Sequence, residues 1–188
     1  MVKKLFFITS VMIFSTSLCV ASDFRDAQWG MSKEQVLSLE KTRPLYSSNE
    51  SLTYRGKLAN IQVHIIYEFL QGKLKSGVYQ FIQNYSNNNV YLKDYKNISD
   101  LLDLKYGNPD NRKEVWNNEL YKEKPLYHGN AISMGHLFLE SKWTTDTTII
   151  VHNLSGNNNL ISHSVNYFDK NVKIHDDEKV DKLELNVL

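Results

Sequence analysis

A regular alternation of side chains between Ile61 and Phe69 constrains the fold of this chain more than any other feature of its sequence. Apolar residues fill every second position of the stretch, and mostly polar residues lie between them. Successive side chains of a β-strand point to opposite faces of a sheet, so this period of two predicts a strand with one buried face. A turn at 70–73 and a similar stretch at 74–83 predict a hairpin, and a strand near 52–58 is expected before it.

A first helix is predicted shortly after Trp29. Ser32 can cap the backbone amide of Gln35 while the Gln35 side chain reaches back, which is the capping-box pattern of a helix start. The helix is expected to end at Arg43-Pro44, because the residue before a proline avoids the helical conformation. A helix of about two to three turns is not stable alone, so it must pack on the sheet.

A second helix is predicted between residues 91 and 106, where the apolar spacing becomes helical. The apolar side chains that follow the helical template are Tyr91, Tyr95, Ile98, Leu101, Leu102 and Tyr106. Asp94 is a candidate cap at its start. Gly107 followed by Pro109 is a typical helix end.

The rest of the chain returns to the period of strands, which are predicted through 115–116 and over 134–143, 147–154 and 160–168, with a loop at 118–133. The predicted fold of the single domain 22–168 is α+β, with short helices packed on a curved antiparallel sheet of about seven to eight strands. The sheet is either continuous or divided into two α-β-β-β(-β) pseudo-repeats, 22–89 and 90–168. The charged residues 169–188 are expected to form a solvated C-terminal tail.

The first 21 residues have the composition of a signal peptide. Lys3 and Lys4 precede an apolar run from Leu5 to Val20, and small residues mark a cleavage site after Ala21. An uncleaved anchor is the weaker alternative, because a spanning helix needs about 20 strongly apolar residues. Lipidation at Cys19 is a second alternative. We therefore expect a periplasmic or secreted protein without stable membrane insertion after cleavage.

Loss of the leader removes the single cysteine and two of the 22 basic residues. The mature chain then has 20 basic and 21 acidic residues, a net charge of −1, and no thiol for a disulfide or a metal. A near-neutral chain lacks the charge that nucleic-acid binders and polybasic membrane-surface proteins carry. We predict no nucleic-acid partner.

Catalytic motifs are absent from the sequence. It contains no Gly-x-Ser-x-Gly elbow, no His-Glu-x-x-His helix and no glycine-rich phosphate loop. A tight turn at Asn157-Asn158 would place His152 opposite His163, where two imidazoles could share zinc with a third ligand or form a hydrogen-bonded pair. We favour the pair, and predict no enzyme activity, no cofactor and no metal.

Aromatic side chains are the most suggestive feature for function. Those on predicted strands that we assign as candidate binding residues are Tyr54, Tyr67, Tyr79, Trp116, Trp143 and Tyr167. Aromatics on the sheet face opposite the helices would form a surface of the kind that dominates protein interfaces. The alternative is that most of them belong to the core.

The start of the folded chain resembles a known group of proteins. The residues that carry the resemblance are Phe24-Arg25, Trp29-Gly30-Met31-Ser32, Val36 and Tyr106-Gly107-Asn108-Pro109. The pattern Trp-Gly-Met-Ser-x-x-x-Val is similar to the helix start of uncharacterised bacterial secreted proteins and of the SmpA/OmlA (BamE) family. It is similar also to the related fold of the β-lactamase inhibitor protein. The resemblance implies helices packed on an antiparallel sheet, and a role in binding other proteins.

These observations favour an exported, non-catalytic protein-binding module of the bacterial cell envelope, either an envelope component or an inhibitor-like protein. Its partner would be another protein in the envelope or the secreted space. The alternative function is a periplasmic small-ligand or lipid-binding protein, which would need a pocket of about 300 Å³ or more.

Overall fold

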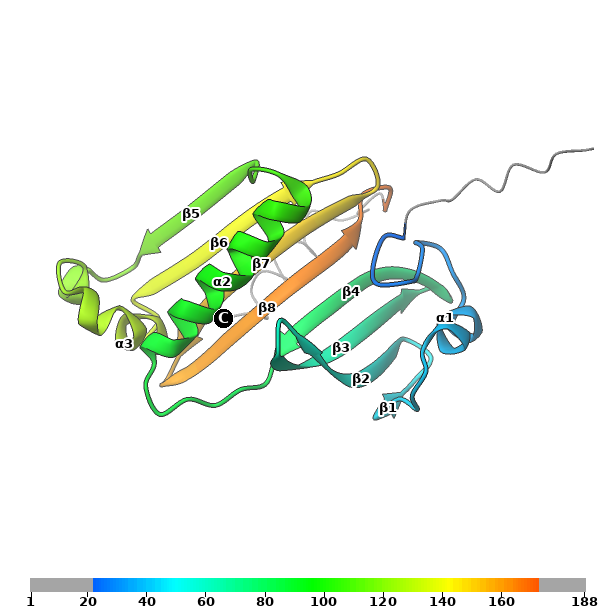
Figure 1. Cartoon of the computed structure of the whole chain (residues 1–188), viewed down its shortest axis with the longest axis horizontal. Helices are drawn as coiled ribbons and strands as arrows, with labels where there is room; N and C mark the ends of the chain where they lie inside the picture. The colour runs from blue at the N-terminus through cyan, green and yellow to red at the C-terminus, as the bar shows by residue number, and fades with distance from the viewer. Residues whose placement is uncertain (1–21, 173–188) are drawn as a thin grey trace, which may run out of the picture.

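An antiparallel sheet of eight strands forms the frame of the protein in the computed structural model, which describes residues 22–172. From one edge to the other, the strands are β1 (Tyr46–Ser47), β2 (Ser51–Leu58), β3 (Ile61–Leu70), β4 (Lys73–Phe81), β8 (Leu160–Asp169), β7 (Thr148–Asn157), β6 (Leu137–Thr144) and β5 (Asn111–Trp116). Every neighbouring pair is antiparallel (Figure 1). The predicted α+β class with an antiparallel sheet is confirmed.

Two meanders make up the sheet and meet at its centre. β1–β4 form one meander and β5–β8 the other, and their last strands, β4 and β8, pair with each other. In this β4–β8 seam, Gly77 lies opposite Tyr167 and Tyr79 opposite Val165. A β-carbon at position 77 would lie only 2.2 Å from the Phe24 ring. Glycine is therefore what allows the N-terminal loop to pack over the seam.

The first helix, α1 (Lys33–Leu39), begins as predicted. The Ser32 hydroxyl accepts a hydrogen bond from the Gln35 backbone N–H (3.3 Å), and the Gln35 side-chain oxygen accepts one from the Ser32 N–H (2.8 Å). The capping box is therefore confirmed.

The end of α1 comes earlier than the predicted Arg43-Pro44. Glu40 is already extended, with φ −82° and ψ 132°. Its carboxylate accepts hydrogen bonds from Arg25 Nε (2.9 Å) and from the Tyr67 hydroxyl. These tertiary contacts hold Glu40 against the sheet and outside the helix.

The second helix, α2 (Asn89–Tyr106), starts earlier than predicted and ends as predicted. The assignment of Asp94 as its cap is wrong, because Asp94 lies inside the helix and its carboxylate accepts a hydrogen bond from the Tyr85 hydroxyl (2.6 Å). Gly107 ends the helix with a positive φ of 82°, and its N–H donates to the Asp103 carbonyl (2.9 Å).

Short helices replace the predicted loop between β5 and β6, in a segment that we name the β5–β6 connection (residues 117–136). They are η1 (Glu119–Tyr121), η2 (Pro125–Tyr127) and α3 (His128–Ser133). β6 begins at Leu137 and not at the predicted Met134. The reason is that the Gly135 N–H still bonds to the Ile132 carbonyl (2.9 Å) and completes the last turn of α3.

The helices cover one face of the sheet, and a core shared by both meanders lies beneath them (Figure 1). Its main cluster joins Val36 of α1 and Ile98 of α2 to Tyr67, Trp143 and Val165 of the sheet. A second cluster lies between α3, the start of α2 and the sheet. The two-layer arrangement therefore buries the same face of every long strand.

The opposite face of the sheet mixes apolar and polar side chains. Ile66, Val78, Asn166 and Val151 lie in register across four central strands and are all half-buried. Asn166 therefore interrupts the apolar row at the centre of this face.

Most of the predicted signal peptide and C-terminal tail lies outside the residues that the structure describes. Within residues 22–172, no helix has both the length and the apolar character needed to cross a membrane. The predicted signal peptide at 1–21 lies outside the described residues, as do residues 173–188 of the predicted tail. The tail prediction began at 169, but Asp169 is the last residue of β8.

Candidate functional site

The six aromatic residues proposed as a binding surface do not lie together on an open face. Tyr54, Tyr67, Trp143 and Tyr167 are buried in the core, and Tyr79 is half-buried beside them. The Phe24 ring packs on three of them, with centroid distances of 5.2 Å to Tyr67, 5.0 Å to Tyr79 and 5.1 Å to Tyr167. The sequence did not assign all six to one side of the sheet, and in the structure these five lie on the face that the helices cover.

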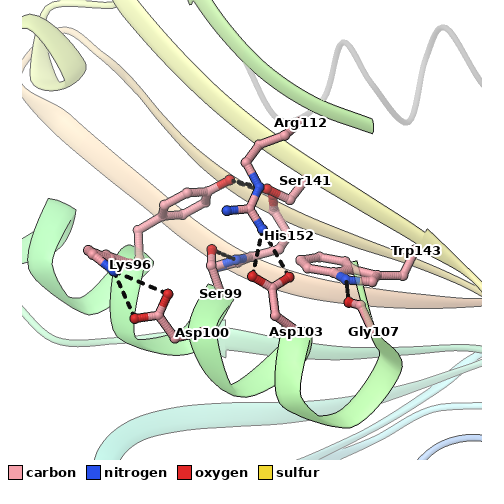
Figure 2. Close-up of polar contacts among 10 residues, drawn as sticks. Lys96, Ser99, Asp100, Asp103, Gly107, Arg112, Ser141, Trp143 and His152 are labelled. Atoms are coloured by element: carbon pink, nitrogen blue, oxygen red, sulfur yellow. Dashed lines mark hydrogen bonds and ion pairs between the residues drawn. The ribbon is translucent and has the colours of Figure 1, made fainter. Parts of the chain in front are cut away.

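Two buried histidines form a closed polar cluster beneath α2. His152 on β7 and His163 on β8 are 0% and 3% exposed, and their Nε2 atoms lie 2.8 Å apart. The Nδ1 atom of His152 lies 3.0 Å from Ser99 Oγ on α2 (Figure 2). One Nε2 must donate and the other accept, so the accepting ring is neutral and the two histidines cannot both be protonated.

Aromatic rings and hydroxyl groups complete this histidine pair. Tyr95 of α2 stacks on His152 with a centroid distance of 4.1 Å, and Phe81 stacks on His163 at 3.9 Å. The Tyr95 hydroxyl lies 3.1 Å from Ser141 Oγ on β6. These polar atoms thus find partners within a buried space that has aromatic walls.

Burial lowers the pKa of both histidines. Burial alone lowers the pKa of His163 to about 3. Burial, followed by the nearby His163 and Arg112, lowers the pKa of His152 well below its ordinary value. A general acid or base works best with a pKa near the operating pH, so the pair is suited to a structural role.

The turn between β7 and β8 lies one residue later than the Asn157-Asn158 turn on which the predicted pairing depended, and His152 is therefore opposite Val165, two residues from His163. The β7–β8 turn lies at Asn158-Asn159, whose φ values of 50° and 65° suit a two-residue hairpin turn. His152 and His163 are therefore diagonal neighbours and are not directly opposite, and they still meet because both point to the helix-covered face.

A zinc ion does not fit between the two rings in this geometry. Two nitrogen ligands of a tetrahedral zinc ion lie about 3.3 Å apart, whereas the Nε2 atoms are 2.8 Å apart. Among residues 22–172 there is also no group of three His, Cys, Asp or Glu side chains that could hold a metal. The geometry is that of a hydrogen-bonded pair.

Polar contacts at the end of α2 close the cluster from outside (Figure 2). Arg112 of β5 forms an ion pair with Asp103 of α2 at 2.8 Å. Trp143 Nε1 donates to the Gly107 carbonyl at 3.0 Å. These contacts join α2 to β5 and β6.

The β5–β6 connection lies at the other end of α2 (Figure 1), and several large apolar side chains in and beside it are exposed. These side chains, which we name the apolar end patch, are Leu120, Leu126, Tyr127, Met134 and Leu160. They are five of the eleven large apolar side chains that are exposed among the described residues. The Asn159 N–H donates to the Ser133 carbonyl (3.0 Å), which holds the β7–β8 turn against α3.

Hydrogen bonds fix the connection to the start of α2. The Asn89 side chain donates to the Leu126 carbonyl (2.8 Å) and accepts from the Gly129 N–H (2.8 Å). Asn88 donates to the Asn130 side chain at 3.3 Å. Close approach of α3 requires Gly129, where a β-carbon would lie 2.4 Å from the Asn88 backbone. The patch is therefore carried on an anchored segment.

Ring contacts support the connection from beneath. Tyr121 stacks on Tyr127, with a centroid distance of 5.5 Å. Trp116, the sixth predicted aromatic, packs edge-on against His128 at 5.0 Å. The His128 Nε2 atom also lies 2.9 Å from the Lys122 carbonyl. Trp116 is thus the one predicted binding residue that lies next to the open apolar surface.

The apolar end patch was missed in the sequence because Leu120, Leu126 and Tyr127 fell in the predicted loop, a segment without periodicity. Met134 and Leu160 were instead assigned to the first residues of predicted strands. One local signal was present: Pro125 stands where helices prefer proline, directly before Leu126 and Tyr127. It could have predicted a short helix with exposed apolar residues.

Comparison of the chain with protein-family models, with curated proteins and with solved structures finds no match. The functional assignment therefore depends on the geometry of the chain itself.

Proposed function

We propose that the protein is an exported, non-catalytic protein-binding module of the bacterial cell envelope, and that it binds its partner through the apolar end patch. The observation that carries this proposal is the concentration of exposed leucine, methionine and tyrosine side chains at one end of the sheet. Exposed apolar clusters of this kind mark interaction sites, since isolated apolar residues are ordinary on protein surfaces.

The composition and support of the patch favour a protein partner. Leu126 is 82% exposed and stands beside Tyr127, and tyrosine is among the residues that carry most of the binding energy in interfaces. The hydrogen bonds from Asn89 hold this segment in place before a partner arrives. A preorganised surface loses less conformational entropy on binding.

The order of elements supports the predicted pseudo-repeats and the resemblance to the β-lactamase inhibitor protein fold. Each half has a helix followed by four antiparallel strands: α1 with β1–β4, then α2 with β5–β8. The β5–β6 connection is an addition to the second half. We propose that a repeated unit built the frame and that this addition supplies the binding surface.

The second candidate function is the binding of a small ligand. A cavity of about 380 Å³ lies beside α1, within the size range of small-molecule sites. Its lining is rich in charged residues, which favours a polar ligand over a lipid.

Site-specific photocrosslinking tests the protein-binding proposal. A photoreactive amino acid is placed at Leu126 in the mature protein, which is then irradiated in envelope extract. We expect one crosslinked species of defined mass that disappears when excess unlabelled protein competes. Leu104 of α2 is the matched control, because it is equally open, 86% against 82% exposed, but lies outside the patch.

The competitor makes the test specific. Excess unlabelled Leu126→Asp/Tyr127→Asp protein should no longer compete, whereas a Leu104→Asp protein should compete as well as the wild type. Equal crosslinking at positions 104 and 126, or none at either, would count against the apolar end patch as a binding surface.

A further inference from the structure

The cavity beside α1 has walls from four separate segments of the chain. The N-terminal loop, the end of α1 with the residues that follow it, strand β2 and Ile65 of β3 surround it. Four basic residues (Arg25, Lys41, Arg55 and Lys57) and two acidic residues (Asp26 and Glu40) contribute to its lining. Basic residues are therefore in excess around this cavity.

Glu40 forms an ion pair with Arg25, one of the four basic residues, so it does not neutralise the other three. Its carboxylate accepts hydrogen bonds from Arg25 Nε (2.9 Å) and from the Tyr67 hydroxyl. The side chain of Glu40 is only 10% exposed, against 30% for Arg25. The remaining cations, Lys41, Arg55 and Lys57, are exposed. Arg55 and Lys57 alternate with the buried Tyr54 along β2, so they project from the other side of the strand and contribute to the lining at the sheet edge.

The hydroxyl group of Tyr54, a residue that lines this cavity, is unsatisfied within residues 22–172. Tyr54 lines the cavity, is 1% exposed, and its hydroxyl has no hydrogen-bond partner among the described residues. Buried polar groups almost always have partners, and one without a partner costs about 1–3 kcal/mol. Burial, followed by the nearby Glu40 charge, raises the pKa of Tyr54, so the hydroxyl keeps the proton that it could donate.

The backbone at the edge of the cavity is also held in an unusual conformation. Arg25 has a positive φ of 55°, which is disfavoured for residues other than glycine. The flanking bridge between Phe24 and Ala27 and the ion pair with Glu40 hold it there. Such conformations persist where the surroundings enforce them, and they are frequent at binding sites.

From these observations we propose that the cavity binds a small molecule that carries an oxyanion, a carboxylate or a phosphate group. The oxyanion would accept the hydrogen bond that Tyr54 cannot make within the protein, and the lysine and arginine side chains would balance its charge. This site shares no residue with the apolar end patch. Its test and the crosslinking test therefore fail independently.

Thermal unfolding and calorimetry of the mature protein test the proposal, with succinate and inorganic phosphate as probes and sodium chloride at equal ionic strength as the reference. We expect saturable stabilisation by at least one of the two probes, and comparison of the two identifies the group that the site prefers. Equal effects of succinate, phosphate and chloride would overturn the proposal.

Two variants separate the site from a general charge effect. Tyr54→Phe should weaken binding about tenfold, because a hydrogen bond to a charged group is lost. The same substitution should not destabilise the ligand-free protein, because the Tyr54 hydroxyl has no hydrogen-bond partner among the described residues. Tyr46→Phe, at an exposed tyrosine of β1, is the matched control and should bind normally.

The second variant, Lys41→Gln, removes one exposed charge from the cavity wall and should weaken binding about threefold, in keeping with a partly screened ionic contact. Affinity unchanged in both Tyr54→Phe and Lys41→Gln would overturn the assignment of the site.

Discussion

The two halves of the sheet carry helices of very different length, and the difference determines what happens to the polar groups beneath them. α1 has 7 residues and buries one, Val36, whereas α2 has 18 residues and buries five. Under α2, the histidine pair is sealed and hydrogen-bonded. Beside α1, a cavity remains open and the Tyr54 hydroxyl lacks a partner. The same order of elements thus produces a structural cluster in one half and a candidate ligand site in the other.

The comparison shows that polar residues in a core have two distinct uses. A fully satisfied network such as that of His152, His163 and Ser99 rigidifies the core and specifies one packing arrangement. An unsatisfied group such as the Tyr54 hydroxyl lowers stability until a ligand supplies its partner. The short helix α1 covers less of the sheet and leaves space for a ligand beside the Tyr54 hydroxyl.

The largest expected effect is acid destabilisation through the histidine pair. The folded pKa values lie below the unfolded value of about 6.5, so below that pH the unfolded chain binds protons that the folded chain excludes. The free energy of unfolding should then fall by about 1.4 kcal/mol per pH unit for each histidine, between about pH 6 and pH 4. Urea denaturation at pH 7, 6, 5 and 4 measures this slope.

Histidine variants show whether the slope belongs to the pair. A His152→Leu/His163→Leu protein, compared with the wild type at each pH, should lose most of the slope. His64→Leu removes a half-buried histidine from the opposite face and should leave it in place. A slope unchanged in the double variant would mean that the cluster under α2 is not sealed.

A smaller effect is expected from opening the contact between α2 and β6. Trp143 is 1% exposed and its indole N–H bonds to the residue that ends α2, so Trp143→Ala should cost about 3–5 kcal/mol of unfolding free energy. Trp143→Phe keeps most of the packing and should cost markedly less. Chemical denaturation of both variants measures the difference, and a cost below about 1 kcal/mol for Trp143→Ala would show that the cover of the second half does not depend on this contact.

The smallest effect concerns the short helix of the first half. Ser32→Ala removes the capping hydroxyl of α1 and should lower the free energy of unfolding by about 1 kcal/mol. Ser38→Ala is the matched control in the same helix, because its hydroxyl bonds to the Gln35 carbonyl without capping. Denaturation curves of the two variants should differ in their midpoints. Identical curves would mean that the Ser32 cap does not stabilise α1, whose end lines the cavity.

The sequence predicted local structure well where a single repeat of side chains determined it. The alternation from Ile61 to Phe69 is β3, and the alternate residues 63, 65, 67 and 69 are buried. The capping box at Ser32 and the helix end at Gly107 are also confirmed. In each of these places, the signal and its partner lie within a few residues of each other.

Features that depend on distant contacts could not be predicted in this way. The sequence placed Tyr54 and Tyr67 on strands but did not reveal that helices cover the face on which both lie. The prediction of Asp94 as a helix cap was wrong because α2 begins at Asn89, and the Asp94 carboxylate accepts a hydrogen bond from the Tyr85 hydroxyl. The apolar end patch was hidden because hydrogen bonds from Asn89, far away in the sequence, order the segment that contains Leu126.

The β4–β8 seam has a consequence for how the chain folds. Gly77 and its partner Tyr167 are about 90 residues apart, so the second edge of β4, the one not paired with β3, must wait for nearly the whole chain before it is paired. Until then β4 is an open edge, which is the feature that invites pairing with a neighbouring chain. The protein should therefore fold slowly for its size. Its tendency to pair with other chains should be greatest in the interval before β8 forms.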